Sequence, residues 1–196
     1  MKLFIFDMGG VMVDGFDVVP ALASDLDITP DVLRAELDAA GMTPLHDGAI
    51  TPLEFWQRYE VLTGRSVAGE PWRDYFKPVR RPAMYALVRQ LQDAGYRVVA
   101  GTNTIDPHYA MHEANGDYAV FDHVYASNLM GVSKPEAEFW RHILGAERVA
   151  ASDALFVDDL AVNVAGAAAL GITAVQYETA EQVSGAVLAT LPVPSA

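Results

Sequence analysis

Residues 3–10 read Leu-Phe-Ile-Phe-Asp-Met-Gly-Gly, and this stretch decides the fold of the chain. The apolar run at residues 3–6 predicts a buried strand, and Asp7 follows directly where that strand ends. Open α/β sheets place their reactive side chains at the carboxyl ends of parallel strands. The two glycines that follow allow the backbone to approach a ligand closely. The octapeptide therefore predicts the first strand of an α/β sheet with a reactive carboxylate at its tip.

The composition is typical of a globular domain with an acidic surface. The chain has 196 residues, of which 52% are hydrophobic and 20% charged, so it is long enough to bury a core. A net charge of −13 argues against nucleic acid or an anionic membrane as a partner. The absence of cysteine excludes disulfides, thiol catalysis and cysteine-bound metals. We expect a cytoplasmic protein that is a monomer or a homodimer and has no membrane-spanning or signal segment.

Strand-like and helix-like segments alternate along most of the chain, which predicts a parallel sheet covered by helices on both faces. The expected strands are residues 2–6, 97–101, 123–126, 154–157 and 172–176. The expected helices between them are residues 82–94, 135–144 and 161–170. The fold class is therefore α/β, with a three-layer, Rossmann-like parallel sheet.

One long interval after the first strand breaks this alternation with helices alone. Helices are expected over residues 18–25, 30–40 and 52–62, and the last begins with the capping box Thr51-Pro52-Leu53-Glu54. An insertion after the first strand lies over the carboxyl ends of the sheet, where a lid covers a reactive site. We therefore expect an α/β core made of residues 1–13 and 82–196, with residues 14–81 as a small helical cap.

Polar or charged residues also occur after other predicted strands and at the start of a predicted helix. Thr102 and the pair Asp158-Asp159 follow strands, and Lys134 directly precedes the helix expected at residues 135–144. Adjacent carboxylates repel each other unless a cation compensates, and oxygen ligands of this kind suit Mg²⁺. A hydroxyl, a cation and a metal site, together with a nucleophilic carboxylate, form the set that phosphoryl transfer through an aspartyl-phosphate requires. The residues that join Asp7 in this set are Thr102, Lys134, Asp158 and Asp159; Asn103 follows Thr102 directly, and Asn163 lies on the helix after the two aspartates.

These segments resemble the four motifs of the haloacid dehalogenase superfamily. The matching stretches are Asp7-Met-Gly-Gly-Val-Met-Val-Asp14, Thr102-Asn103, Lys134-Pro135 and Asp158-Asp159 with Asn163. The insertion resembles the helical cap of that superfamily's first subgroup. The resemblance implies a Mg²⁺-dependent phosphomonoesterase that hydrolyses a small phosphorylated metabolite through an aspartyl-phosphate.

The resemblance also implies a role for each residue. Asp7 is expected to be the nucleophile, with Thr102 and Lys134 as its catalytic partners. The residues expected to bind the phosphoryl oxygens are Thr102, Asn103 and Lys134. The ligands expected for Mg²⁺ are Asp7, the main-chain carbonyl of Gly9, Asp158 and Asp159, with Asp158 either as a ligand or as a support. Asp14 is expected to mark the hinge into the cap.

Gly9 stands where most phosphatases of the superfamily carry a second aspartate. That aspartate protonates the leaving oxygen and then activates water, and such acid–base catalysis contributes about 10²–10⁴-fold. The chain resembles a branch that lacks it and includes bacterial glucose-1-phosphate phosphatases. A sugar 1-phosphate is thus one candidate substrate, because an anomeric oxygen leaves more readily than an ordinary alkoxide. His108 is a candidate replacement for the proton donor, since histidine titrates near neutral pH.

Two other functions stay open. A 2-haloacid dehalogenase also lacks the second aspartate, because a halide leaves without a proton, but it uses no metal and does not need both Asp158 and Asp159. A catalytically weak or inactive domain could bind a phosphometabolite or a partner protein, although such a domain would not need to keep Asp7 and Lys134. Phosphate release measured with and without Mg²⁺ distinguishes the three functions.

Overall fold

A computed structural model describes residues 3–191, and it confirms the α/β fold. Five parallel strands form one sheet in the order β5-β4-β1-β6-β7. They are β1 (Leu3–Phe6), β4 (Arg97–Thr102), β5 (His123–Ala126), β6 (Ala154–Asp158) and β7 (Thr173–Gln176). Each expected strand is present, and only residue 2 of the first lies outside the described residues.

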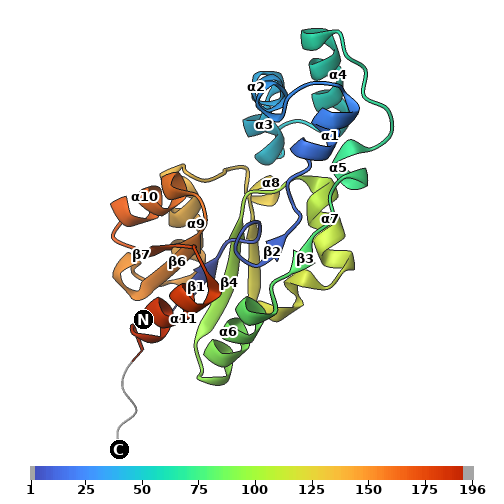
Figure 1. Cartoon of the computed structure of the whole chain (residues 1–196). Coiled ribbons are helices and arrows are strands. Elements are labelled where there is room, and N and C mark those ends of the chain that lie inside the picture. The colour runs from blue at the N-terminus through green and yellow to red at the C-terminus, as the bar shows by residue number, and fades with distance from the viewer. Residues whose placement is uncertain (1–2, 192–196) are drawn as a thin grey trace, which may run out of the picture.

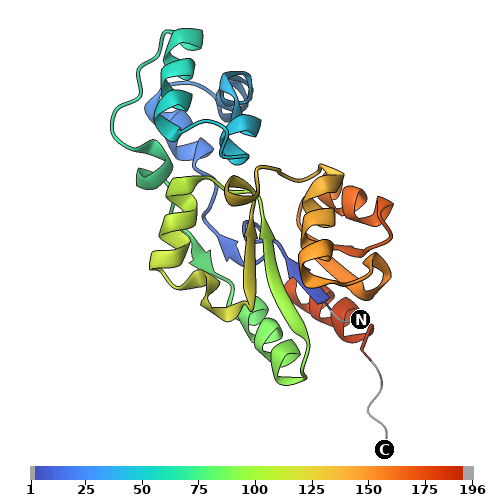
Figure 2. The same ribbon diagram turned by 180° about the vertical axis from the view of Figure 1, so that it is seen from behind.

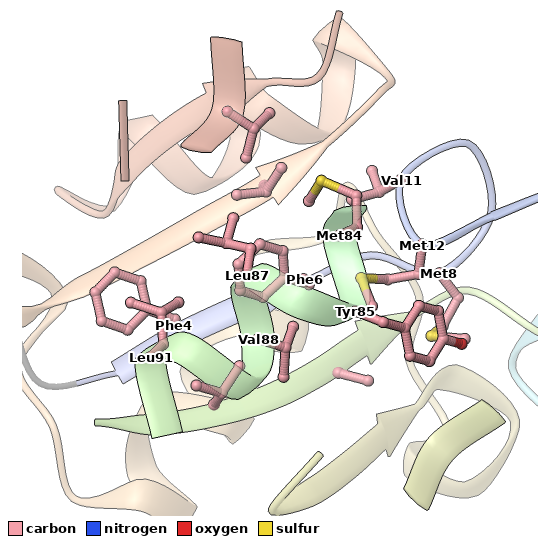
Figure 3. Packing of buried hydrophobic residues seen from close by; sticks show 14 of the residues in the cluster. Phe4, Phe6, Met8, Val11, Met12, Met84, Tyr85, Leu87, Val88 and Leu91 are labelled. Carbon is pink, nitrogen blue, oxygen red and sulfur yellow. The ribbon is translucent and has the colours of Figure 1, made fainter. Parts of the chain in front are cut away.

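Helices cover both faces of this sheet, as Figures 1 and 2 show. Successive residues of β1 point to opposite faces, because side chains alternate along a strand. Phe4 and Phe6 pack against α6 (Pro82–Asp93) and α11 (Ala180–Leu188), and Figure 3 shows part of this cluster. Leu3 and Ile5 pack on the other face, against α9 (Ala137–Glu147) and α10 (Ala161–Ala169). Burial on both faces explains why the first strand is a continuous apolar run.

The topology places Asp7 at the middle of the sheet edge. Strand β1 pairs with β4 on one side and with β6 on the other, so Phe6 lies opposite both Ala100 and Val157. The backbone N–H of Asp7 donates to the carbonyl of Val157 at 2.9 Å, which continues this pairing by one residue. The ends of three neighbouring strands therefore meet around Asp7.

Four further helical segments of the described chain lie between strands β4 and β6 of the sheet. They are α7 (Asp106–Ala114), α8 (Ser127–Met130) and the 3₁₀ helices η1 (Asp117–Val120) and η2 (Ala151–Asp153). The helix expected at residues 135–144 differs from the prediction at both ends, because α9 begins at Ala137 and ends at Glu147. It begins later because Lys134 is held in a loop by hydrogen bonds to Asn103. Gly145 does not end it, since a glycine inside a helix costs only about 1 kcal/mol.

A group of helices lies above the carboxyl edge of the sheet (Figure 1). They are α1 (Val19–Asp25), α2 (Pro30–Ala40), α3 (Met42–His46), α4 (Pro52–Thr63) and α5 (Pro71–Asp74). These helices share a buried core of their own, to which Leu33, Phe55 and Tyr59 belong. The capping box at the start of α4 is confirmed, because the N–H of Glu54 donates to Thr51 Oγ1 and the N–H of Thr51 donates to Glu54 Oε2.

The chain crosses between the core and these helices at a short ribbon. Strand β2 (Val13–Asp14) pairs antiparallel with β3 (Val79–Arg80). Next to it, the Arg81 guanidinium donates to both carboxylate oxygens of Asp14 and to the carbonyl of Gly10. Asp14 thus lies at the crossing, and the division into a core and a cap at residues 14–81 stays a prediction.

A substitution at Gly166 tests how tightly α10 packs on α9. A Cβ atom at Gly166 would lie 2.7 Å from Cη2 of Trp140 and 3.1 Å from the carbonyl oxygen of Pro135. We expect Gly166→Ala to lower the free energy of unfolding by about 1–3 kcal/mol, because the contact overpacks the core. Gly185→Ala in α11 is the matched control, since no atom lies within 4 Å of its Cβ position. Urea denaturation should show the control slightly stabilised, and equal changes in both variants would contradict this packing.

Candidate active site

Lys134 lies between two carboxylates at the end of the sheet. Its Nζ donates to Asp7 Oδ1 at 2.8 Å and to Asp158 Oδ2 at 2.6 Å, and all three residues are buried. The rings of Phe139 and Phe156 lie 5.8 and 5.4 Å from the same nitrogen. A buried charge is tolerated only when it is paired and hydrogen-bonded. The lysine therefore fixes the positions of both carboxylates.

These groups shift each other's protonation. Burial raises the pKa of Asp7 from 3.8 to about 7, the positive charge of Lys134 opposes that rise, and Asp158 adds to it. Burial acts to lower the pKa of Lys134, but the two carboxylates outweigh it and raise that pKa above its ordinary value. The lysine thus stays charged at neutral pH, whereas Asp7 has a protonation state that a bound cation can change.

Asn103 holds the loop that carries Lys134. Its Nδ2 donates to the carbonyl of Lys134 at 2.9 Å, and its Oδ1 accepts from the backbone N–H of Lys134 at 2.8 Å. The side-chain amide is thus engaged with the backbone, and the prediction that Asn103 binds phosphoryl oxygens stays a prediction. Thr102 ends β4, is buried, and lines the same cavity as Asp7 and Lys134.

Both oxygens of Asp158 are occupied by hydrogen-bond donors. Its Oδ1 accepts from the N–H of Leu160 at 2.9 Å and from Asn163 Nδ2 at 3.0 Å. Its Oδ2 accepts from Lys134 and, at 3.1 Å, again from Asn163. Asn163, which is buried on α10, therefore orients this carboxylate. This arrangement favours Asp158 as a support for neighbouring ligands over Asp158 as a ligand.

The expected metal ligands are brought together. Carboxylate oxygens of Asp7, Asp158 and Asp159 all lie within 4.8 Å of one another. Asp159 packs against Gly10, where φ is 73° and a Cβ atom would come within 2.2 Å of Asp159 Oδ2. A glycine at this position thus makes room for the carboxylate. Oxygen atoms in this arrangement fit Mg²⁺, which takes one or two carboxylates and keeps several waters.

The position of the second aspartate is covered by an aromatic ring. A Cβ atom on Gly9 would lie 2.9 Å from Cδ2 of Phe16, so the ring stands where a side chain would begin. Phe16 comes from the segment between β2 and α1, which the sequence pattern did not single out. Only the folded structure shows that it reaches Gly9.

A cavity of about 390 Å³ opens between the sheet edge and the cap helices. Polar groups line its floor, namely Asp7, Thr102, Asn103, Lys134, Asp159 and Asn163. Apolar side chains line most of the wall, namely Phe16, Val18, Val19, Leu37, Met42, Trp72, Phe76 and Leu160. The site therefore combines a small charged floor with a wide apolar wall.

His108 also lines this cavity, but it does not fit the role of an acid. Its ring stacks on Phe76 with 3.8 Å between centroids, and burial lowers its pKa to about 3. Burial lowers the pKa of His46 as well. His112, the third cavity histidine, pairs with Asp117 at 2.7 Å. At neutral pH, His46 and His108 are thus uncharged and hold no acidic proton. In the cap, Tyr59 belongs to the buried core and Trp56 packs against that core.

The sequence model of the haloacid dehalogenase-like hydrolase family matches residues 1–171. The chain belongs to this family. It is thus an enzyme of the hydrolase class with the family's α/β core. The predicted resemblance to this superfamily is thus confirmed for the family, for the hydrolase class and for the fold.

One of the proteins to which the chain is similar is a phosphatase. The sesquiterpene phosphatase astK of Aspergillus oryzae is 30% identical over 176 residues, which cover 87% of each protein. The drimenol cyclase drtB of Aspergillus calidoustus is 28% identical over 97 residues, 49% of this chain but 18% of drtB. Among solved structures, the HAD family enzyme BT-2542 of Bacteroides thetaiotaomicron matches with a TM-score of 0.78 at 22% identity, covering 95% of this chain and 98% of that one.

A second structure of BT-2542 contains magnesium and inorganic phosphate, and it matches with a TM-score of 0.74 at 23% identity, covering 91% of this chain and 94% of that one. At these identities the likeness shows the shared fold. Within residues 3–191, no helix has the length and apolar character needed to cross a membrane.

Proposed function

We propose that the chain is a Mg²⁺-dependent phosphomonoesterase that transfers the phosphoryl group of a small metabolite to Asp7. One observation carries this proposal. A buried lysine holds Asp7 and Asp158 together at the floor of a cavity, beside the carboxylate of Asp159. Phosphoryl transfer depends on positioning and on the neutralisation of negative charge, and this floor supplies both.

Each residue has a defined task in this proposal. Asp7 attacks phosphorus, Lys134 balances the charge of the phosphoryl oxygens, and the Thr102 hydroxyl donates to one of them. Asn103 keeps Lys134 in place through the loop backbone. Asp7, the carbonyl of Gly9 and Asp159 would hold Mg²⁺, with Asp158 as their support. When bound, the ion would supply positive charge beside the transferring phosphoryl group.

The wall of the cavity favours a substrate with an apolar organic group. A sugar brings several hydroxyls, and each would lose hydrogen bonds to water against aromatic and aliphatic side chains. An apolar group gains about 25 cal/mol for each Å² that it buries on the same wall. The similarity to a sesquiterpene phosphatase supports this choice. We therefore favour an apolar phosphate over the sugar 1-phosphate, while the cytoplasmic location and the monomeric or homodimeric state stay predictions of the sequence.

A panel of compounds tests this function directly. The panel contains 1-naphthyl phosphate, glucose 1-phosphate and 2-chloropropionate, each with Mg²⁺ and with a chelator. We expect phosphate release from 1-naphthyl phosphate only with Mg²⁺, and slower release from glucose 1-phosphate. Halide release that a chelator leaves unchanged would establish a dehalogenase instead. No turnover of any compound would leave a binding domain as the remaining function.

The affinity for Mg²⁺ is expected to rise with pH between about 6 and 8. Without a cation, burial keeps Asp7 protonated up to its pKa of about 7, and a carboxylate must lose its proton to bind a metal. Each pH unit below that value should weaken binding about tenfold. Calorimetric titration checks this, with Asp7→Asn as the control because its amide carries no titrating proton. A wild-type affinity that does not change with pH would contradict the role of Asp7 as a ligand.

A further inference from the structure

Phe16, and not the backbone, closes the position of the missing acid. A Cβ atom on Gly9 would lie 2.9 and 3.1 Å from two atoms of the Phe16 ring. The φ angle of Gly9 lies outside the left-handed region, so its backbone conformation would accept a side chain. An aspartate introduced at this position must therefore displace the ring before it can reach a leaving group.

The histidines and the lysine of the cavity offer no replacement for that acid. Burial keeps His46 and His108 uncharged at neutral pH, and His112 is engaged with Asp117. The Nζ of Lys134 already donates to Asp7 at 2.8 Å and to Asp158 at 2.6 Å.

The other carboxylates that line the cavity are hydrogen-bonded, exposed to solvent, or placed where a cation fits. Asp17 accepts from the N–H of Val19 at 2.9 Å and from the Arg34 guanidinium at 2.8 Å. Asp38 is exposed on cap helix α2. Asp159 places a carboxylate oxygen within 4.8 Å of those of Asp7 and Asp158, in the arrangement that fits a cation. Among the described residues that line the cavity, none therefore stands ready to protonate a leaving oxygen.

We propose that this site acts on phosphoryl compounds whose leaving group is already a stable oxyanion, and that Phe16 enforces this choice by covering Gly9. Aryl and enol phosphates meet this requirement, and so does the terminal phosphoryl group of an apolar diphosphate. The alkoxide of a simple alcohol does not. This inference rests on the proposed function and narrows its substrate class.

The reaction balances without a protein acid. Asp7 Oδ forms a bond to phosphorus while the bond from phosphorus to the leaving oxygen breaks, and its electron pair stays on that oxygen. Water then attacks phosphorus in the aspartyl-phosphate, and the bond to Asp7 breaks. Both protons of the water end on inorganic phosphate as H₂PO₄⁻, and Asp7 returns as a carboxylate.

Substrate comparison on the wild-type protein tests this inference first. The quantity is kcat/KM with Mg²⁺ for 4-nitrophenyl, 4-chlorophenyl and phenyl phosphate, and for decyl diphosphate beside decyl phosphate. We expect kcat/KM to fall steeply along the phenyl series as the leaving group becomes more basic. The alkoxide that leaves from decyl phosphate needs a general acid, whereas the phosphate that leaves from decyl diphosphate does not. Because a general acid contributes at least about 10²-fold, decyl phosphate should be slower by at least that factor.

Variants then test the part assigned to Phe16. The double variant Gly9→Asp/Phe16→Ala should raise kcat/KM for decyl phosphate about 10²-fold above Phe16→Ala alone and flatten the phenyl series. Gly9→Asp alone should raise it less, because the Phe16 ring must first move away from the new Cβ atom. Gly9→Asn/Phe16→Ala is the matched control, with a side chain of the same size and no acid. Circular dichroism melting checks that each variant is folded.

The outcomes separate this inference from the proposed function. If kcat/KM falls steeply along the phenyl series and decyl diphosphate is inert, the inference is supported and the substrates are aryl or enol phosphates. Decyl phosphate hydrolysed as fast as decyl diphosphate, or a flat phenyl series in the wild type, overturns the inference while the phosphatase function stands. No turnover of any of these compounds overturns the proposed function, and this inference with it.

Discussion

Asp7→Asn is expected to lower the rate of phosphate release by at least about 10⁴-fold, because the variant loses the atom that bonds to phosphorus. An amide nitrogen cannot attack phosphorus, and an amide oxygen is a poor nucleophile. The fold should persist, since Lys134 keeps its bond to Asp158 in the variant. Phosphate release from 1-naphthyl phosphate with saturating Mg²⁺ measures the effect.

Asp38→Asn is the matched control for this loss. Asp38 is also an aspartate that lines the cavity, but it is exposed on α2 and lies in the cap. Its substitution should change kcat/KM less than about tenfold, because an exposed charge interacts weakly through water. A loss in Asp7→Asn no greater than in the control would contradict the role of Asp7 as the nucleophile.

Lys134→Met is expected to cost about 3–5 kcal/mol of unfolding free energy and also to abolish turnover. The methionine leaves Asp7 and Asp158 buried beside each other without the cation that bridges them. The loss should be smaller near pH 5 than near pH 8. Burial raises the pKa of Asp7 in the folded state, so the folded variant binds a proton at Asp7 more tightly than the unfolded chain does and loses stability as pH rises.

Lys77→Met provides the comparison for this prediction. Lys77 is exposed in the segment between α5 and β3, so its substitution should change the unfolding free energy by no more than about 0.5 kcal/mol. Urea denaturation of both variants without metal, at both pH values, gives the four numbers needed. If the two variants unfold alike at pH 8, Lys134 does not compensate buried charge as the geometry indicates.

Much of the fold could be predicted because its signals are local. Strands buried on both faces appear as apolar runs, and the start of α4 carries its capping box in four consecutive residues. The ribbon of β2 and β3 could not be predicted, because strands of two residues leave no periodic pattern. The short helices α3 and α5 escaped prediction for the same reason.

The candidate site also combines features that the sequence could predict with contacts that it could not. The sequence predicted that the motif residues meet at one sheet edge, because the ends of parallel strands lie together. It could not show that Asn103 binds the backbone of Lys134, a contact across 31 positions. Nor could it place Phe16 over Gly9 or bury His108 against Phe76, since these contacts depend on where the cap lies.

The central claim is that the phosphoryl group passes through a covalent bond to Asp7, and rapid quenching tests it most directly. Without an aspartate at residue 9 to activate water, the aspartyl-phosphate should accumulate when the leaving group departs easily. The wild type mixed with 4-nitrophenyl phosphate and Mg²⁺ should release a burst of nitrophenol approaching one equivalent per chain. Mass spectrometry of the acid-quenched protein should then find one added phosphoryl group on the peptide that contains Asp7. Steady turnover with no burst and no phosphorylated peptide would contradict the claim.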